Sequence, residues 1–256
     1  MTDLLTPPAT AAVQRSGYAP LTNMTLAIQT LYEIMEEPAD STTRLGILYG
    51  NSGVGKTVAS AFAAARTGAA YIAAKSLWTQ LPLLRALAEE LGIMRPARTA
   101  ADLLDQIIDE LNRAPRALIV DEMDRLVMKK TVEIIRDIHD ATSIPIMMIG
   151  EENLLAKLKE WDRFDNRVLV ATPAQPASVE DVLLLRDHYG LGGIVADDLA
   201  IHIAERCHGV IRRIVSNLKK AGRTAATEGV DRIDRAWWGN RPIRTGDIPT
   251  RRSMGA

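Results

Sequence analysis

The segment GNSGVGKT, residues 50–57, constrains the fold of this chain more than any other feature of the sequence. It fits the pattern Gly-x-x-x-x-Gly-Lys-Thr of a phosphate-binding loop. The apolar run RLGILYG leads into it, so we expect a strand, the glycine loop and then a helix. In that order, backbone N–H groups and the positive end of the helix dipole face a bound phosphate. The sequence therefore predicts a nucleotide site built from Gly50, Asn51, Ser52, Gly53, Val54, Gly55, Lys56 and Thr57.

A pair of acids downstream completes the expected chemistry. The apolar run ALIVDE, residues 117–122, ends in Asp121 and Glu122, so both carboxylates should emerge at the end of a strand, beside the loop. Lys56 would bind the β and γ phosphates, and the Thr57 hydroxyl would ligate Mg²⁺. Asp121 would hold the same ion through water, while Glu122 would orient and deprotonate the attacking water. The expected cofactors are ATP and Mg²⁺.

Apolar runs alternate with helical patterns through the middle of the chain. Strand-like runs recur after the loop, and between them apolar residues return at helical spacing. This alternation predicts an α/β fold of the P-loop NTPase kind, with a mainly parallel sheet covered by helices on both faces. The expected strands after the loop lie at about 71–74, 117–122, 145–150 and 167–171.

The pattern changes near residues 172–177 and divides the chain. Beyond Ser178, an expected N-cap, only helices are predicted, at about 178–189, 195–207 and 210–227. The predicted parts are an irregular N-terminal arm (1–21), an α/β nucleotide-binding core (22–172), a small helical lid (173–228) and a basic C-terminal tail (229–256).

Composition excludes several classes of protein. No apolar run is long enough for a bilayer span and the N-terminus lacks a signal-peptide pattern, so we expect a cytoplasmic protein, in the bacterial host cytoplasm if phage-encoded, with no membrane partner. A net charge of −1 excludes bulk attraction to nucleic acid, so binding would need a local basic stripe or an oligomer. Neither disulfides nor zinc are expected from Cys207, His139, His188, His202 and His208.

Three arginines are candidates for stabilising the negative charge at the γ-phosphate during hydrolysis. A single subunit rarely supplies all of the positive charge that this step needs. Arg163 and Arg167 lie in WDRFDNRV, just before the last expected strand, where they would face a neighbouring subunit's nucleotide in a head-to-tail assembly. Arg212, in GVIRRI at a helix start in the lid, could reach the nucleotide of its own subunit. We therefore expect a homo-oligomer, either a ring or a helical filament.

The segments GNSGVGKT, ALIVDEMDRL, WDRFDNR and GVIRR together resemble the AAA+ ATPases. Residues 120–155 are similar to the transposition ATPases typified by the phage Mu B protein, TnsC and TniB. That resemblance implies ATP-bound subunits that assemble on duplex DNA, select it as a target for transposition and recombination by a phage or mobile element, and recruit and stimulate a transposase. It assigns Lys56 and Thr57 to phosphate and magnesium, Asp121 to magnesium, Glu122 to the attacking water, Arg167 to a finger in trans and Arg212 to a second sensor.

The resemblance also raises two local questions. The family commonly places a small polar sensor after the fourth strand, and here GEEN offers either Glu151 or Asn153. Lys75, Lys129 and Lys130 follow the second and third strands and are expected to contact the DNA backbone without sequence preference. Four arginines near the C-terminus could bind DNA or transposase, or belong to a disordered tail: Arg241, Arg244, Arg251 and Arg252.

Other functions fit the same nucleotide site. A replication initiator or helicase loader would also act on DNA, although we expect the segment after the lid to be too short for an origin-binding module. A secretion-type ATPase would act on protein partners, and a nucleotide-binding scaffold would not hydrolyse ATP. Stimulation of hydrolysis by duplex DNA separates these hypotheses, because the transposition and loader hypotheses predict it and the secretion hypothesis does not.

Overall fold

The computed structural model describes residues 19–161 and 166–246. They form two compact units. One, the sheet unit, is Asn23–Gln175, and the other, the helical unit, joins the described residues up to Thr22 with those from Pro176 onward. Among the described residues, no helix combines the length and the apolar character needed to cross a membrane.

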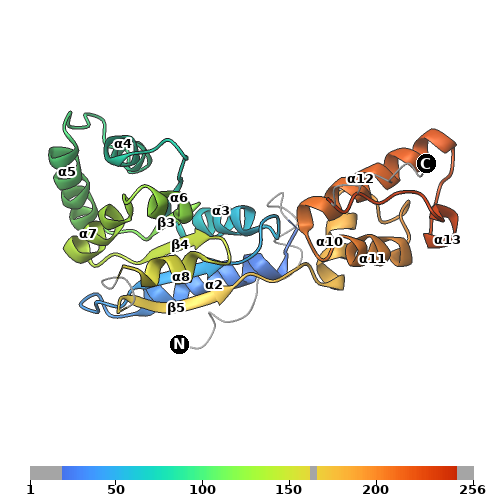
Figure 1. Ribbon diagram of the computed structural model, residues 1–256, viewed down its shortest axis with the longest axis horizontal. Helices are drawn as coiled ribbons and strands as arrows, with labels where there is room; N and C mark the ends of the chain where they lie inside the picture. Colours follow the sequence, from blue (N-terminus) through green and yellow to red (C-terminus); the bar gives the residue numbers. More distant parts are fainter. Residues whose placement is uncertain (1–18, 162–165, 247–256) are drawn as a thin grey trace, which may run out of the picture. The chain divides into compact units, whose positions relative to one another are not determined.

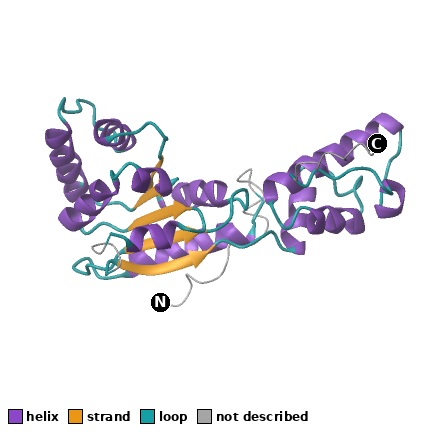
Figure 2. Ribbon diagram, in the orientation of Figure 1, coloured by secondary structure: helices purple, strands orange, loops and turns teal. Residues whose placement is uncertain are grey.

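The sheet unit contains five parallel strands in the order β2-β3-β4-β1-β5. Figure 2 draws the strands in orange. The strands are β1 (Leu45–Tyr49), β2 (Ala70–Ala73), β3 (Leu118–Asp121), β4 (Ile146–Gly150) and β5 (Val168–Pro173). In the register, Leu45 pairs with Ile146 on one side and with Val168 on the other. Because all neighbours are parallel, the carboxyl ends of the five strands meet at one edge of the sheet. The predicted α/β fold is confirmed.

Helices cover both faces of this sheet (Figure 1). They are α2 (Thr22–Glu36), α3 (Lys56–Thr67), α4 (Gln80–Glu90), α5 (Ala100–Arg113), α6 (Met123–Met128), α7 (Val132–Thr142) and α8 (Leu154–Lys159). In β4, Ile146 and Met148 join the apolar cluster under α4 to α8, whereas Met147 and Ile149 join the one under α2 and α3. This two-residue alternation lets short, wholly apolar strands fill two cores.

The short helix α6 follows β3 directly and was not expected from the sequence. Its six residues are too few for apolar periodicity to indicate a helix. Met123 and Leu126 are fully buried and anchor it against the cluster under α4 to α8. The residue before α6 is Glu122, so this helix fixes the backbone that follows the expected catalytic acid.

The helical unit contains four helices among its described residues. They are α10 (Val179–His188), α11 (Asp197–Arg206), α12 (Ile211–Glu228) and α13 (Arg235–Trp238). Ser178 caps α10 as predicted: its side chain accepts from the Asp181 N–H, and the Asp181 carboxylate accepts from the Ser178 N–H. Asp181 also accepts from the Thr22 N–H at 2.8 Å, which attaches the chain before α2 to this unit.

Residues 229–246 differ from the tail that we expected. Ile233 pairs with Val195 in an isolated parallel bridge, and Trp238 in α13 is only 2% exposed within the apolar cluster of the helical unit. Burial of these two apolar side chains explains why an arginine-rich stretch is packed. Arg241 donates to Glu228, and the Arg244 carbonyl accepts from Asn217. Two predicted tail residues, Arg251 and Arg252, lie outside the described residues.

Candidate functional site

The predicted phosphate loop connects β1 to α3 at the carboxyl edge of the sheet. Gly53 and Gly55 have φ angles of 85° and 96°, which side chains with a Cβ rarely adopt. Helix α3 begins at Lys56, immediately after this turn. The loop therefore has the strand, turn and helix order that presents backbone N–H groups to a phosphate.

Asn23 was not predicted from the sequence, and its side chain holds this loop in place through hydrogen bonds. Its Nδ2 donates to the carbonyls of Val54 and Gln175, both at 2.8 Å, and its Oδ1 accepts from the Gln175 N–H at 2.8 Å. The residue is 3% exposed. A polar residue on the apolar face of α2 is the signal that could have found it, but its partners are distant in sequence and no motif marks them.

Lys56 lies among four carboxylates. Its Nζ donates to the carbonyls of Gly50 at 2.6 Å and Asn51 at 2.8 Å. Burial lowers the pKa of Lys56, and the nearby negative charges oppose that shift. These charges belong to Asp121, Glu151, Glu122 and Asp124. The structure thus brings the loop lysine together with both acids that the sequence predicted.

Asp121 has the environment of an oriented metal ligand. It ends β3, is 3% exposed, and accepts from the Tyr71 hydroxyl at 2.9 Å and from the Glu122 N–H at 2.7 Å. Burial and the neighbouring carboxylate raise the pKa of Tyr71, so its hydroxyl remains a donor. The carboxylate keeps further lone pairs, and Thr57 adds a hydroxyl in the first turn of α3. This oxygen donor set fits Mg²⁺.

Glu122 connects β3 to α6 in a left-handed conformation, with φ 58° and ψ 38°. Such a conformation costs free energy for a residue other than glycine, and it recurs at functional sites. The Glu122 side chain is 42% exposed, and its Oε2 lies 3.4 Å from Nε of Arg125. The expected general base is therefore accessible and paired with one arginine.

Asp124 is a second buried polar residue that no sequence motif marked. It is 6% exposed and accepts from the Glu151 N–H at 2.6 Å and from Nζ of Lys157 at 2.7 Å. A Cβ on Gly150 would lie 2.4 Å from its Oδ2, so the chain after β4 needs glycine there. Asp124 therefore fixes the segment in which the sensor was expected.

The two sensor candidates differ in their surroundings. The Glu151 carboxylate raises the pKa of Lys56, so it lies within electrostatic range of the loop. Asn153 is exposed and precedes α8 without a side-chain capping bond. The assignment of either residue as the sensor stays a prediction.

Arg167 lies at the opposite edge of the sheet from its own phosphate loop. Its carbonyl accepts from the Leu45 N–H at the start of β1, whereas the loop follows the end of that five-residue strand, about 16 Å further along. Its Nε and Nη2 donate to the two oxygens of Asp140 on α7, at 2.6 and 2.9 Å. The alternative finger, Arg163, lies outside the described residues.

Arg212 is the second residue of α12 and belongs to the helical unit. Gly209, with φ 67°, precedes it, and a Cβ there would lie 2.5 Å from Cβ of Pro176. That close approach fixes the turn before α12. The role of Arg212 toward the nucleotide stays a prediction.

The three lysines expected to contact DNA are exposed. Lys75 follows β2, whereas Lys129 and Lys130 form the turn between α6 and α7. Strands β2 and β3 are neighbours, with Ala73 opposite Asp121, so the loop after β2 and the chain after β3 leave the sheet at the same edge. Nζ of Lys75 lies 5.7 Å from the Trp78 ring centroid, which leaves its charge at the surface.

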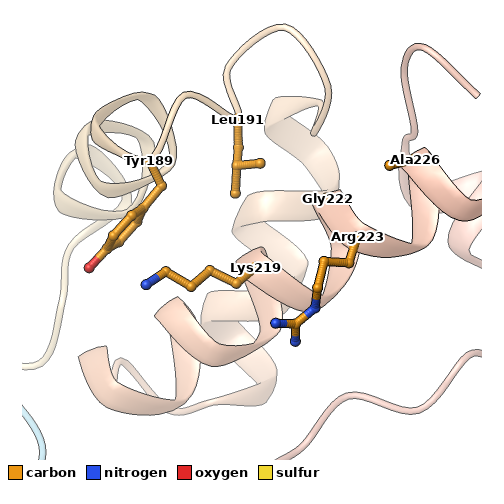
Figure 3. Close-up of a pocket in the computed structure, with 6 residues that line it drawn as sticks. All are labelled: Tyr189, Leu191, Lys219, Gly222, Arg223 and Ala226. Atoms are coloured by element: carbon orange, nitrogen blue, oxygen red, sulfur yellow. The ribbon is translucent and has the colours of Figure 1, made fainter.

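The helical unit carries a shallow groove of about 320 Å³ that no sequence motif indicated. Figure 3 shows the ammonium of Lys219 directed at the Tyr189 ring, with 4.2 Å between Nζ and the ring centroid. Gly222 forms part of the floor, where a Cβ would lie 2.5 Å from Leu191. Arg223, one turn beyond Lys219 on α12, places a second cation at the same groove.

Comparisons with known proteins agree with this fold. Residues 39–158 match the family described as AAA domain. No curated protein sequence matches the chain.

Three solved structures are similar in fold. Cdc6p from Pyrobaculum aerophilum has a TM-score of 0.62 at 17% identity, over 87% of this chain and 67% of that protein. The Orc1 protein of Aeropyrum pernix, in complex with DNA, has a TM-score of 0.61 at 19% identity, over 84% and 62%. A RuvB mutant from Thermotoga maritima has a TM-score of 0.54 at 18% identity, over 84% and 65%. This chain therefore spans about two thirds of each relative.

These matches agree with three features of the structure: the sheet order, the conformation of the phosphate loop and the acids at the end of β3. The chain has the fold of an AAA+ P-loop NTPase, and residues 39–158 are similar to the AAA-domain family.

Proposed function

We propose that this protein is an ATPase that assembles on duplex DNA in its ATP-bound state and leaves it after hydrolysis. One observation carries the proposal: Arg167 lies a full strand length from its own phosphate loop, while Asp121 and Glu122 lie near Lys56 of that loop. An arginine at that edge serves catalysis only if it reaches the nucleotide of a second copy. Such head-to-tail contacts generate rings or filaments.

Within each site, the described residues have separable roles. The phosphate loop and Lys56 bind the phosphates, and Thr57 with Asp121 would hold Mg²⁺, which supplies positive charge to them when bound. Glu122 accepts the proton of the attacking water. Asp124 keeps the backbone of Glu151 beside the site.

Exposed lysines support DNA as the polymer on which assembly occurs. Lys75, Lys129 and Lys130 lie on chain segments that leave one edge of the sheet. A net charge of −1 gives one subunit no bulk attraction to DNA, and affinity from only two or three basic side chains is weak. Linking many subunits through nucleotide contacts multiplies weak phosphate contacts into stable binding that depends strongly on salt.

The finer proposal is a role in transposition, in which the assembled protein selects target DNA and recruits and stimulates a transposase. Its support is the resemblance of residues 120–155 to the transposition ATPases. A replication initiator or helicase loader is the second candidate, favoured by the fold shared with the Cdc6 and Orc1 proteins. Stimulation of a transposase by the ATP-bound protein on DNA supports the first, whereas loading of a replicative helicase supports the second.

Hydrolysis measured with and without duplex DNA tests the proposal. We expect duplex DNA to raise the rate of the wild type. Each of Lys75→Ala, Lys129→Ala and Lys130→Ala should reduce the slope of log affinity against log salt by about 0.9 for each DNA phosphate that the lysine neutralises. Lys159→Ala removes an exposed lysine at the end of α8 and should leave the slope unchanged. Equal hydrolysis rates with and without DNA would contradict the proposal.

A further inference from the structure

The groove on the helical unit presents two cations that pair with no carboxylate in the described part of the chain. Nζ of Lys219 faces the Tyr189 ring, and Arg223 follows one turn later on α12 (Figure 3). Lys220, on another side of the same helix, is used in packing, because its Nζ donates to the Pro242 carbonyl at 2.6 Å. Lys219 and Arg223 are therefore exposed charges available to a second molecule.

The floor of the groove is apolar. Leu191 passes so close to Gly222 that a Cβ there would lie 2.5 Å from the leucine side chain. With Ala226 one turn later, this glycine leaves a hollow between Leu191 and the Tyr189 ring. A DNA backbone would use the cations but not the apolar floor. An apolar floor bordered by cations instead fits a protein surface on which an aromatic side chain lies beside carboxylates.

The last turns of α2 carry such a surface, which we call the acidic patch: Tyr32, Glu33 and Glu36. The Tyr32 side chain is 45% exposed, and both glutamates are exposed within one turn of it. Neither glutamate pairs with a cation among the residues that the structure describes, and the last turn of α2 contains no basic residue. Carboxylates at this end of a helix face the negative end of its dipole, where cations are preferred. A cation from another molecule would therefore stabilise the end of α2.

The acidic patch lies at the edge of the sheet that carries Arg167. Arg44, directly before β1, donates to the carbonyls of Ile34 and Met35 near the end of α2, at 3.3 and 3.2 Å. The Arg167 carbonyl accepts from the Leu45 N–H at the start of the same strand. In the proposed head-to-tail assembly this edge faces a neighbouring copy, so the acidic patch faces that copy as well.

We propose that the groove on α12 of one copy binds the acidic patch of the next copy, with Tyr32 in the hollow and the two glutamates at Lys219 and Arg223. The inference rests on the proposed function, because it names two surfaces that join the copies of that assembly. Burial of the ring supplies affinity, whereas the opposite charges fix the register of the contact. Each copy has one groove and one patch, so the contact is head-to-tail and propagates.

Charge reversal on each side tests the contact by sedimentation velocity, with duplex DNA and a non-hydrolysable ATP analogue. Lys219→Glu with Arg223→Glu makes the groove negative, and Glu33→Lys with Glu36→Lys makes the patch positive. Either double variant alone opposes like charges, so we expect the protein concentration at half-maximal assembly to rise about tenfold or more. An equal mixture of the two should assemble at wild-type concentrations, because reversed grooves then meet reversed patches and native grooves meet native patches.

Three further variants serve as controls. The chain with both sides reversed has the net charge of the wild type and should assemble as the wild type does. Asp105→Lys with Asp109→Lys reverses two exposed carboxylates one turn apart on α5, and it should not raise the concentration needed for assembly. Tyr32→Ala removes the ring without changing the charge, so it should raise that concentration about tenfold.

Recovery on mixing is a readout that damage to folding does not produce. The inference would be overturned, and the proposed function left intact, if both double variants or Tyr32→Ala assembled as the wild type does. The same conclusion would follow if neither the mixture nor the fully reversed chain recovered assembly. A wild type that does not assemble would instead contradict the proposed function, and this interface with it.

Discussion

Glu122 combines a strained backbone conformation with the expected role of general base. Its φ of 58° turns the chain from β3 into α6, and its neighbour Asp121 is held by Tyr71 and by the Glu122 N–H itself. The two acids are therefore not equivalent. Asp121 is buried and held by two hydrogen bonds, while the carboxylate of Glu122 is accessible to water and to Arg125.

Replacing Glu122 tests this division of roles. An amide cannot take the proton of water, so Glu122→Gln should lower the single-turnover hydrolysis rate by about 10²- to 10⁴-fold. The Kd for ATP should stay close to that of the wild type, because the phosphate contacts come from the loop. Glu89→Gln, an exposed site on α4, serves as the control. A normal hydrolysis rate in Glu122→Gln would assign the base to another group.

At the scale of secondary-structure elements, the phosphate loop depends on packing against α2 and the end of β5. Asn23 bonds to Val54 in the loop and to Gln175 after β5. About two turns further along α2, Thr30 shares a hydrogen bond of 2.7 Å with Thr172 of β5. The segment before the first strand thus holds the phosphate loop in place as well as covering the sheet.

Asn23→Ala should weaken both folding and nucleotide binding. It leaves buried donors and acceptors unpaired, so we expect the free energy of unfolding of the sheet unit to fall by about 2–4 kcal/mol. The Kd for ATP should rise because the Val54 carbonyl loses its anchor. Chemical denaturation and nucleotide titration measure the two effects. Thr25→Ala, at an exposed site on α2, should change stability by less than about 0.5 kcal/mol, and an equal loss there would contradict the assignment.

At the level of secondary-structure elements, part of the fold and of the candidate site was predictable from the sequence. The strands and the loop were predictable because apolar periodicity and the glycine pattern are local signals. Asn23 and Asp124 were not, since each acts through partners far along the chain, such as Gln175 and Lys157. Helix α6 was too short to have a period, and the packing of residues 229–246 depends on a few apolar side chains in an arginine-rich stretch.

At the scale of the whole molecule, the proposed role of Arg167 in catalysis requires a second copy of the chain. Its pairing with Asp140 presents the guanidinium at the edge of the sheet where β5 begins. A subunit can therefore supply an arginine to a neighbour while receiving one from another. The proposed assembly would place hydrolysis at the contacts between subunits.

Mixing two slow variants tests whether Arg167 acts on the nucleotide of a neighbouring subunit. Arg167→Ala should hydrolyse ATP slowly, because its neighbour receives no arginine, and Glu122→Gln should be slow because it lacks the base. A mixture of the two variants should recover part of the activity, since some contacts then join an intact site to an intact arginine. Steady-state hydrolysis of the mixture against each variant alone measures the recovery. No recovery would exclude Arg167 from action in trans.

Sedimentation velocity with duplex DNA and a non-hydrolysable ATP analogue tests the central claim most directly. We expect large assemblies on DNA when both ligands are present, none when either is omitted, and none for Lys56→Ala under any condition. A wild-type protein that stays monomeric with saturating analogue and DNA would contradict it.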